Sequence, residues 1–307
     1  MVARVSATIS VRNLRKAYGS TLAVDGVSFE VEQGEFFGIL GPNGAGKTTT
    51  LEMLEGLREP DGGELAVLGL SPWPRNPALL PRMGVQLQAS SFFERLSARE
   101  QIRTFASLYG VPASRADEML AVVGLAEQAE VRAEKLSGGQ AQRLSIACAL
   151  VHDPELVFMD EPTGALDPQA RRNLWDLLRR INADGRTVVL TTHHMDEAET
   201  LCDRVAIMDH GKILELGPPA VLVRGLDTPV RISVASGQLS AATALSLAGD
   251  VTGGNVTDNG VSLSIATRDP ASVLAGLAGQ DALTGLRVQG ATLEDVFLSL
   301  TGREYRE

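Results

Sequence analysis

Apolar residues fall in short continuous runs along the first part of the chain, and these runs alternate with helical patterns. The runs at 36–40, 156–159 and 187–192 are typical of strands that are covered on both faces, as in a parallel sheet. Residues 168–182 place their apolar side chains on one helical face, at Leu174, Leu177, Leu178 and Ile181. The pattern therefore predicts an α/β fold with a mixed sheet flanked by helices.

Two further patterns surround this core. Residues 9–14 and 22–31 have the pattern of an antiparallel β lead-in, with apolar and polar positions alternating around Ile9. Helical periodicity runs from 98 to about 133, with breaks at Val111-Pro112 and Val123-Gly124. We interpret this middle stretch as a helical insert at about 90–152.

The chain after Gly217-Pro218-Pro219 contains short strand and helix patterns without any grouping of catalytic residue types. We expect a large α/β domain at 1–220 and a small C-terminal α/β accessory domain at 228–307. The expected strands of the second domain are 230–234, 261–265 and 286–289, and the expected helices are 241–247, 271–278 and one that begins near Thr292.

Residues 41–48 fit the pattern G-x-x-x-x-G-K-[ST] of a phosphate-binding loop between a predicted strand and a predicted helix. The glycines let the backbone bend and expose N–H groups, and the helix N-terminus adds its positive dipole end. Lys47 would reach the β- and γ-phosphates, and the Thr48 hydroxyl would bind Mg²⁺. The alternative is a glycine-rich turn without a ligand, and the strand–loop–helix context favours a nucleotide. The residues expected to contact ATP here are Gly41, Pro42, Asn43, Gly44, Ala45, Gly46, Lys47, Thr48 and Thr49.

Polar groups follow the ends of two further predicted strands. Asp160 and Glu161 end the run at 156–159, at the edge where α/β sheets bind their ligands. We expect Asp160 to hold Mg²⁺ through its water shell and Glu161 to polarise the attacking water. His193 follows the strand at 187–192 and could bond a γ-phosphate. We interpret the adjacent His194 as a surface residue.

Two signals are weaker when each is taken alone. Tyr18 stands beside Gly19 between the lead-in strands, where an aromatic ring could stack on adenine. Ser137 is a natural N-cap, and the glycines after it permit close approach to a ligand. A capped helix with no further role would explain that segment equally well.

Composition and charge narrow the range of functions. The net charge of −10 and the pI near 5.0 argue against nucleic acid as the main partner. No apolar run approaches the roughly 18 residues needed to span a bilayer, and the N-terminus lacks a signal-peptide pattern. We therefore expect a cytoplasmic location. Cys148 and Cys202 are interpreted as small buried apolar residues.

In combination, these motifs resemble the ATP-binding subunit of an ABC transporter over residues from about 7 to 220. The matches are the adenine-stacking aromatic at Tyr18, Walker A at 41–48, the Q-loop glutamine at Gln88 rather than Gln86, the LSGGQ signature at 136–140, Walker B at 156–160, the catalytic glutamate at Glu161, the D-loop at 165–167 and the switch histidine at His193. The chain departs from the family pattern at Cys148, where arginine is frequent, and at Ala165, where glycine is usual. Neither departure removes a catalytic group. Residues 293–303 resemble the tail of daunorubicin-type drug-resistance exporter ATPases.

The resemblance implies a head-to-tail homodimer that hydrolyses ATP with Mg²⁺. Each ATP would lie between Walker A of one chain and the signature of the other. The resemblance gives Glu161, His193, Lys47 and Gln88 catalytic roles, gives Thr48, Gln88 and Asp160 the metal, and gives Ser137, Gly138, Gly139 and Gln140 to the partner's nucleotide.

The resemblance also implies a separate transmembrane permease subunit and a peripheral position at the cytoplasmic face of the membrane. Phe92, Phe93 and Leu96, with the helical insert, form our candidate docking groove, although these side chains could equally pack inside the insert. Drugs or other hydrophobic compounds are the expected cargo of an exporter. An importer ATPase and a soluble non-transport ABC protein remain as alternatives.

Overall fold

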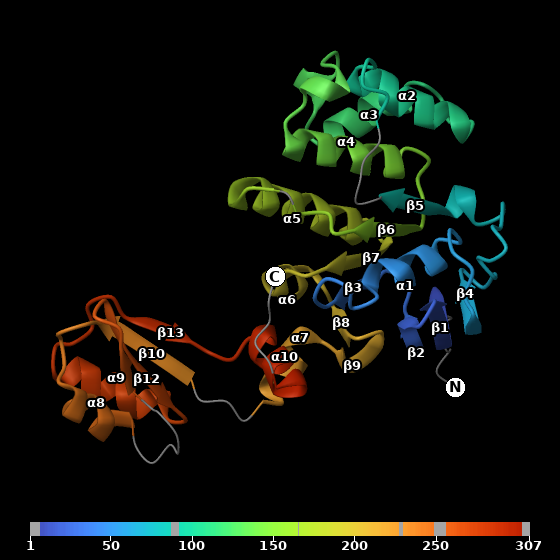
Figure 1. Ribbon diagram of the computed structural model, residues 1–307. Coiled ribbons are helices and arrows are strands. Elements are labelled where there is room, and N and C mark those ends of the chain that lie inside the picture. The colour runs from blue at the N-terminus through green and yellow to red at the C-terminus, as the bar shows by residue number, and fades with distance from the viewer. Residues whose placement is uncertain (1–6, 87–91, 165, 227–229, 249–255, 303–307) are drawn as a thin grey trace, which may run out of the picture. The chain divides into compact units, whose positions relative to one another are not determined.

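In the computed structural model of the chain, six strands form one sheet that carries the predicted motifs (Figure 1). The structure describes residues 7–86, 92–164, 166–226, 230–248 and 256–302. The sheet has the order β5-β6-β7-β3-β8-β9, and β9 alone runs antiparallel to its neighbour. Its strands are β3 (Phe36–Leu40), β5 (Met83–Gln86), β6 (Leu156–Asp160), β7 (Thr187–Thr192), β8 (Arg204–Asp209) and β9 (Lys212–Gly217).

The three predicted continuous apolar runs are the buried strands β3, β6 and β7, in which every residue is buried. Because these strands are parallel, their carboxyl ends meet at one edge of the sheet. The register pairs Leu40 with Thr192 and Asp160 with Thr191. The residues that follow these strand ends therefore start close together, although they are far apart in the chain.

A three-stranded antiparallel sheet packs against one face of the six-stranded sheet. It has the order β2-β1-β4 and consists of β1 (Ile9–Tyr18), β2 (Thr21–Val31) and β4 (Gly62–Val67). The rings of Phe29 and Phe37 stack between the two sheets with centroids 5.1 Å apart. Strand β1 continues to Tyr18, so Tyr18 ends a strand and does not lie in a loop as the sequence had indicated.

Helices cover both faces of the six-stranded sheet. Helix α1 (Lys47–Leu54) buries Leu51 and Leu54 in the same core as the three-stranded sheet. On the other face, α6 (Met195–Leu201) packs against β3, β7 and α5 (Pro168–Ala183). The close approach of α6 requires Gly38, because a Cβ there would lie 2.7 Å from the Cys202 sulfur.

Three helices form the insert, as the periodicity predicts. They are α2 (Ala98–Leu108), α3 (Arg115–Val122) and α4 (Gly138–Leu150), and α4 packs against β5 and α5 (Figure 1). A capping box begins α2, because the Ser97 N–H donates to the Glu100 carboxylate at 2.8 Å and the Glu100 N–H donates to the Ser97 hydroxyl at 3.3 Å.

The chain divides into two compact units between Pro219 and Ala220. Helix α7 (Pro219–Arg224) begins at Pro219, where the sequence pattern predicts no element. The second unit contains β10 (Val230–Ala235), α8 (Ala241–Ala248), β11 (Val256–Asp258), β12 (Ser262–Thr267), α9 (Pro270–Gly279), β13 (Arg287–Gln289) and α10 (Leu293–Thr301). Its antiparallel sheet has the order β11-β12-β10-β13, the split β-α-β arrangement of ferredoxin-like domains.

Strand β11 has no counterpart in the sequence prediction. It has three residues, and the two that end it, Thr257 and Asp258, are exposed and polar. A strand this short gives no alternating pattern to detect. Within the described ranges, no helix is long and apolar enough to cross a membrane.

Candidate nucleotide-binding site

The loop from Gly41 to Gly46 is held against β2 and β8 so tightly that two of its positions accept only glycine. Gly46 has φ 102°, and a Cβ there would lie 2.2 Å from the Ala23 carbonyl oxygen. At Gly41, a Cβ would lie 2.2 Å from the Met208 carbonyl oxygen. The loop therefore enters helix α1 with a fixed backbone, as a phosphate cradle requires.

Lys47, the first residue of α1, turns its amine back over this loop. The side chain is 4% exposed, and its Nζ donates to the Gly41 carbonyl at 2.8 Å and to the Pro42 carbonyl at 3.2 Å. The same Nζ lies 3.2 Å from Glu161 Oε1. The buried cation is thus paired with a carboxylate that follows β6 at the same edge of the sheet, which offsets its loss of hydration.

Asp160 connects the end of β6 to the phosphate loop and to β7. The Thr48 hydroxyl donates to its two carboxylate oxygens at 3.2 and 3.3 Å, and the Thr191 hydroxyl donates to Oδ1. Burial raises the pKa of Asp160 above its ordinary value, while the bonds from Thr191 and Thr48 lower it in part. Oxygen donors from Thr48 and Asp160 thus lie side by side, a donor set that suits Mg²⁺.

Glu161 has an unusual backbone for a residue with a side chain, since its φ is 44°. Its N–H donates to the carbonyl and to the hydroxyl of Thr191, each at 3.1 Å, and these bonds hold the strained conformation. The turn directs one carboxylate oxygen to Lys47 and the other to within 3.2 Å of His193 Nδ1. A single carboxylate therefore joins the phosphate-loop lysine to the histidine after β7.

The interpretation of His194 as a surface residue is wrong. His194 is half-buried, and its ring lies against that of His193 with centroids 4.1 Å apart. The His194 N–H donates to the Thr192 hydroxyl at 2.9 Å. The contact between the two rings limits where the His193 side chain can move. The alternation of side chains along a strand does not apply to His194, because β7 ends at Thr192.

Tyr18 lies at the end of β1 with its ring 43% exposed. The guanidinium carbon of Arg58 lies 5.2 Å from the ring centroid and Lys16 Nζ lies 5.9 Å from it. The ring is thus an accessible aromatic face beside cations, which is the environment that a stacked base with phosphates could use.

The predicted signature residues begin helix α4. The Gln140 N–H donates to the Ser137 hydroxyl at 3.3 Å, and the Ser137 N–H donates to Gln140 Oε1 at 2.9 Å, which forms a capping box. Ser137 and Gly138 are exposed, whereas Gly139 lies against Leu166 and Ala170. Among the hydrogen bonds of the described residues, none joins this segment to the phosphate loop of the same chain.

The structure therefore brings one subset of the predicted residues together. Lys47, Thr48, Asp160, Glu161 and His193 meet at the carboxyl edge of the six-stranded sheet. Gln88 lies outside the described residues, as does Ala165 of the D-loop. Gln86, the other glutamine near the predicted Q-loop position, ends β5 and is buried.

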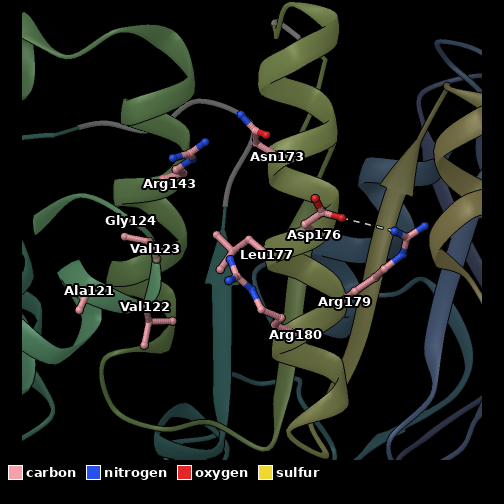
Figure 2. Close-up of a pocket in the computed structure, with 10 residues that line it drawn as sticks. All are labelled: Ala121, Val122, Val123, Gly124, Arg143, Asn173, Asp176, Leu177, Arg179 and Arg180. Atoms are coloured by element: carbon pink, nitrogen blue, oxygen red, sulfur yellow. Dashed lines mark hydrogen bonds and ion pairs between the residues drawn. The ribbon is translucent and has the colours of Figure 1, made fainter.

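A cleft of about 660 Å³ lies between the helical insert and α5 (Figure 2). It contains none of the residues of the phosphate loop. Its insert wall carries Arg143 and the α3–α4 connection, and its α5 wall carries Asn173, Asp176 and Leu177. The cleft thus lies between α5 and the insert. It is distinct from the candidate nucleotide site.

Sequence reasoning missed three buried groups around the site. Thr191 bonds Asp160, but a threonine within an apolar strand gives no signal beyond β propensity. Glu55 and Glu197 are acids with 4% and 0% exposure. A glutamate within a helix is usually solvated, so only the three-dimensional packing identifies these two.

Comparisons with known proteins agree with this geometry. A family described as ABC transporter matches residues 24–164. The Nod factor export ATP-binding protein I of Ralstonia nicotianae is 41% identical over 313 residues, covering 97% of this chain and 95% of that protein. The linearmycin resistance ATP-binding protein LnrL of Bacillus subtilis is 36% identical, covering 97% of this chain and 100% of its own. The solved structure of cbiO1 from Clostridium perfringens, described as part of the ABC transporter complex cbiONQ, superposes with a TM-score of 0.65 at 27% identity, covering 71% of this chain and 91% of that one.

Proposed function

Because this chain belongs to the ABC transporter family of ATP-binding proteins, we propose that it is the energy-coupling ATPase of an exporter for drugs or other hydrophobic compounds. The observation that carries the proposal is the meeting of Lys47, Thr48, Asp160, Glu161 and His193 at one sheet edge. These groups have the charges and hydrogen-bonding atoms that phosphoryl transfer to water requires, since that reaction depends mainly on positioning and charge neutralisation.

The phosphates of ATP would lie along the backbone N–H groups of residues 41–49, at the N-terminus of α1. Gly41 and Gly46 support this placement, because neither has a side chain that would lie between the loop backbone and a phosphate group. Lys47 would contact the β- and γ-phosphates. Tyr18 would stack on the adenine, for which its exposed ring supports a role.

Thr48 and Asp160 would hold Mg²⁺, with Gln88 as a further ligand. The fit rests on the Thr48 hydroxyl and the Asp160 carboxylate, which lie 3.2 Å apart on two elements. When bound, Mg²⁺ would neutralise charge on the phosphate oxygens. The raised pKa of Asp160 results first from burial, so a nearby cation would favour the ionised carboxylate.

The Lys47–Glu161 ion pair defines what must change when ATP enters. A γ-phosphate would offer Lys47 a new anionic partner and would release Glu161 from its 3.2 Å contact. Glu161 could then orient the attacking water, while His193, now 3.2 Å from Glu161 Oε2, would contact the γ-phosphate. The strained backbone of Glu161 keeps its carboxylate at the sheet edge through this exchange.

Ser137, Gly138, Gly139 and Gln140 would complete the site of a second copy of the chain. Exposure of Ser137 and Gly138 at the N-terminus of α4 supports this role, because free N–H groups at a helix N-terminus attract phosphate. A head-to-tail pair related by two-fold symmetry would enclose two ATP molecules.

A separate permease subunit would carry the cargo through the membrane, with this chain at the cytoplasmic face. The two curated relatives above support export by their names, and both cover 97% of this chain, which includes most of the second unit. Phe93 is 61% exposed and supports the docking groove that Phe92 and Leu96 would share.

The test of the ATPase mechanism is Glu161→Gln, which keeps the size of the side chain and removes its charge. We expect ATP affinity to persist, turnover to fall about 100-fold or more, and ATP-dependent dimers to accumulate, because hydrolysis no longer opens them. Equilibrium ATP binding, phosphate release and light scattering measure the three effects.

The matched control is Glu127→Gln, an exposed acid in the helical insert, which should behave as the wild type. Wild-type turnover in Glu161→Gln would remove Glu161 from its proposed role. Absence of Mg²⁺-dependent ATP hydrolysis by the unmodified chain would overturn the proposed function itself.

A further inference from the structure

Glu197 is a buried acid that the proposed chemistry does not use. It lies in α6, four residues after His193, and its exposure is 0%. Removing a carboxyl group from water is costly unless neighbouring groups replace the lost hydration. The identity of those neighbours therefore indicates what the buried acid does.

Three segments supply the groups around Glu197. The Trp175 indole Nε1, in α5, donates to Glu197 Oε1 at 3.1 Å. Burial raises the pKa of Glu197, and the Thr192 and Thr163 hydroxyls, the indole and the Arg171 guanidinium lower it in part. The carboxyl group thus lies where the end of β7, the turn after β6 and helix α5 converge.

Each of these segments leads directly to a residue of the proposed catalytic cycle. Thr192 is the last residue of β7 and precedes His193. Thr163 lies two residues after Glu161 in the turn that leads to the D-loop. Helix α5 has Asp167, the end of the D-loop, as its N-cap. A single side chain therefore lies against the end of β7, the turn before the D-loop and the helix that follows the D-loop.

Two observations indicate that this junction can rearrange. Thr163 Oγ1 and Glu197 Oε2 are both buried, and neither has a hydrogen-bond partner within the described ranges, so a small movement that brings the two atoms into hydrogen-bonding distance would recover part of the cost of burial. Helix α5 is also not fully packed against the insert, because Asn173, Asp176 and Leu177 line the cleft of about 660 Å³ shown in Figure 2.

We propose that Glu197 is a positioning residue that couples the switch loop at His193 to helix α5 and its D-loop, so that both move together when nucleotide binds. The proposal rests on the ATPase function proposed above. Without the carboxylate, the switch loop and the D-loop would be placed independently, and fewer molecules would adopt the arrangement that hydrolyses ATP. The phosphate loop is not touched by Glu197, so ATP affinity should persist.

The experiment compares Glu197→Gln with Glu199→Gln, an exposed acid in the same helix. Glutamine keeps the size and can still accept the Trp175 bond, but it removes the charge. We expect kcat of Glu197→Gln to fall at least about tenfold, with KM for ATP within about twofold of wild type. Such a result would mean that ATP still binds but that fewer bound complexes reach the arrangement that hydrolyses it. Glu199→Gln should match the wild type in both constants.

Tryptophan fluorescence supplies a readout that a merely structural role would not move. The chain has two tryptophans, so Trp73→Phe leaves Trp175 as the reporter. Adding ATP with Mg²⁺ should change the Trp175 emission of this reporter chain, and the change should be absent when Glu197→Gln is added. This arm requires only ATP binding, so it separates a failure of coupling from a failure of the ATPase function.

Wild-type kcat in Glu197→Gln, together with an unchanged Trp175 response, would overturn the proposal. If Glu197→Gln does not fold, Trp175→Phe takes its place, because it removes the indole donor and keeps an aromatic ring. Trp175→Phe should then lower kcat without changing KM, and wild-type kcat in that variant would equally overturn the coupling.

Discussion

Glu55 is the C-cap of helix α1 and is 4% exposed, and its Oε1 has no hydrogen-bond partner among the described residues. Burial, together with the nearby charges of Asp160 and Glu52, raises the pKa of Glu55 from its ordinary value of 4.5 to about 8. The folded chain therefore binds a proton at neutral pH that the unfolded chain releases. Binding of this proton therefore makes the free energy of unfolding depend on pH, through a residue close to the candidate metal ligand Asp160.

The sign of the pH effect follows from that raised pKa. Stability from Glu55 is fully present below the ordinary pKa of 4.5 and is lost as pH rises through about 8. Within this window the free energy of unfolding should fall by about 1.4 kcal/mol per pH unit from this group. Glu55→Gln should remove that slope, because the amide stays neutral. Urea unfolding between pH 5.5 and 8.5 measures the difference.

Glu59→Gln, an exposed acid nearby, is the control and should keep the wild-type slope. Equal slopes for Glu55→Gln and the wild type would show that the Glu55 proton does not contribute. Asp160 also has a raised pKa, but it is present in both chains and cancels from the comparison.

At the scale of single residues, the sequence identified groups whose chemistry is local and missed those whose partners are distant. Gly46 and Lys47 belong to one short motif, so their spacing in the sequence was sufficient to predict their role. The contact of Lys47 with Glu161 and that of Trp175 with Glu197 join segments that only the fold brings together. The sequence also does not distinguish a buried glutamate from a solvated one, because burial depends on how the folded chain packs.

At the scale of elements, continuous apolar runs predicted β3, β6 and β7, and periodicity predicted α5, because burial on both faces or on one stripe determines those patterns. Helix α6 gave no such pattern. It buries Glu197 with Ala198 and Leu201, so a buried acid interrupts its apolar stripe. Strand β11 was too short to show alternation.

The exposed turn before α2 is the element that we expect to contact the permease. Phe93→Asp should prevent co-purification with that subunit and leave ATP hydrolysis by the free chain unchanged, because Phe93 is 61% exposed and its side chain does not support the core. Affinity capture of the co-expressed pair measures assembly.

The control is Leu22→Asp in β2, outside the helical insert, where the residue is 51% exposed. Leu22→Asp should assemble normally. Capture of the permease by Phe93→Asp at the wild-type level would contradict the docking groove.

At the scale of the whole molecule, the chain carries the two halves of a proposed site on separate segments, with no hydrogen bond between them among the described residues. The phosphate loop and Glu161 meet at the sheet edge, whereas Ser137 and Gly138 are exposed at the start of α4. A single chain therefore holds the reacting groups but leaves its signature unused. Two copies in head-to-tail arrangement would use both halves, and this pairing is the central claim of the account.

Mixing two inactive variants tests that pairing directly. Lys47→Ala removes the cation of the phosphate loop. Gly138→Asp adds negative charge at the signature, where a Cβ meets nothing within 4 Å and an acid suits the helix N-terminus, so the fold should persist. In a mixed dimer, the intact phosphate loop of one chain faces the intact signature of the other.

The decisive measurement is ATP hydrolysis by each variant alone and by their equimolar mixture. Each variant alone should be inactive, and the mixture should recover up to about a quarter of the wild-type rate, because half of the dimers are mixed and each has one complete site of two. A mixture that stays as inactive as its separate components would contradict the shared nucleotide site.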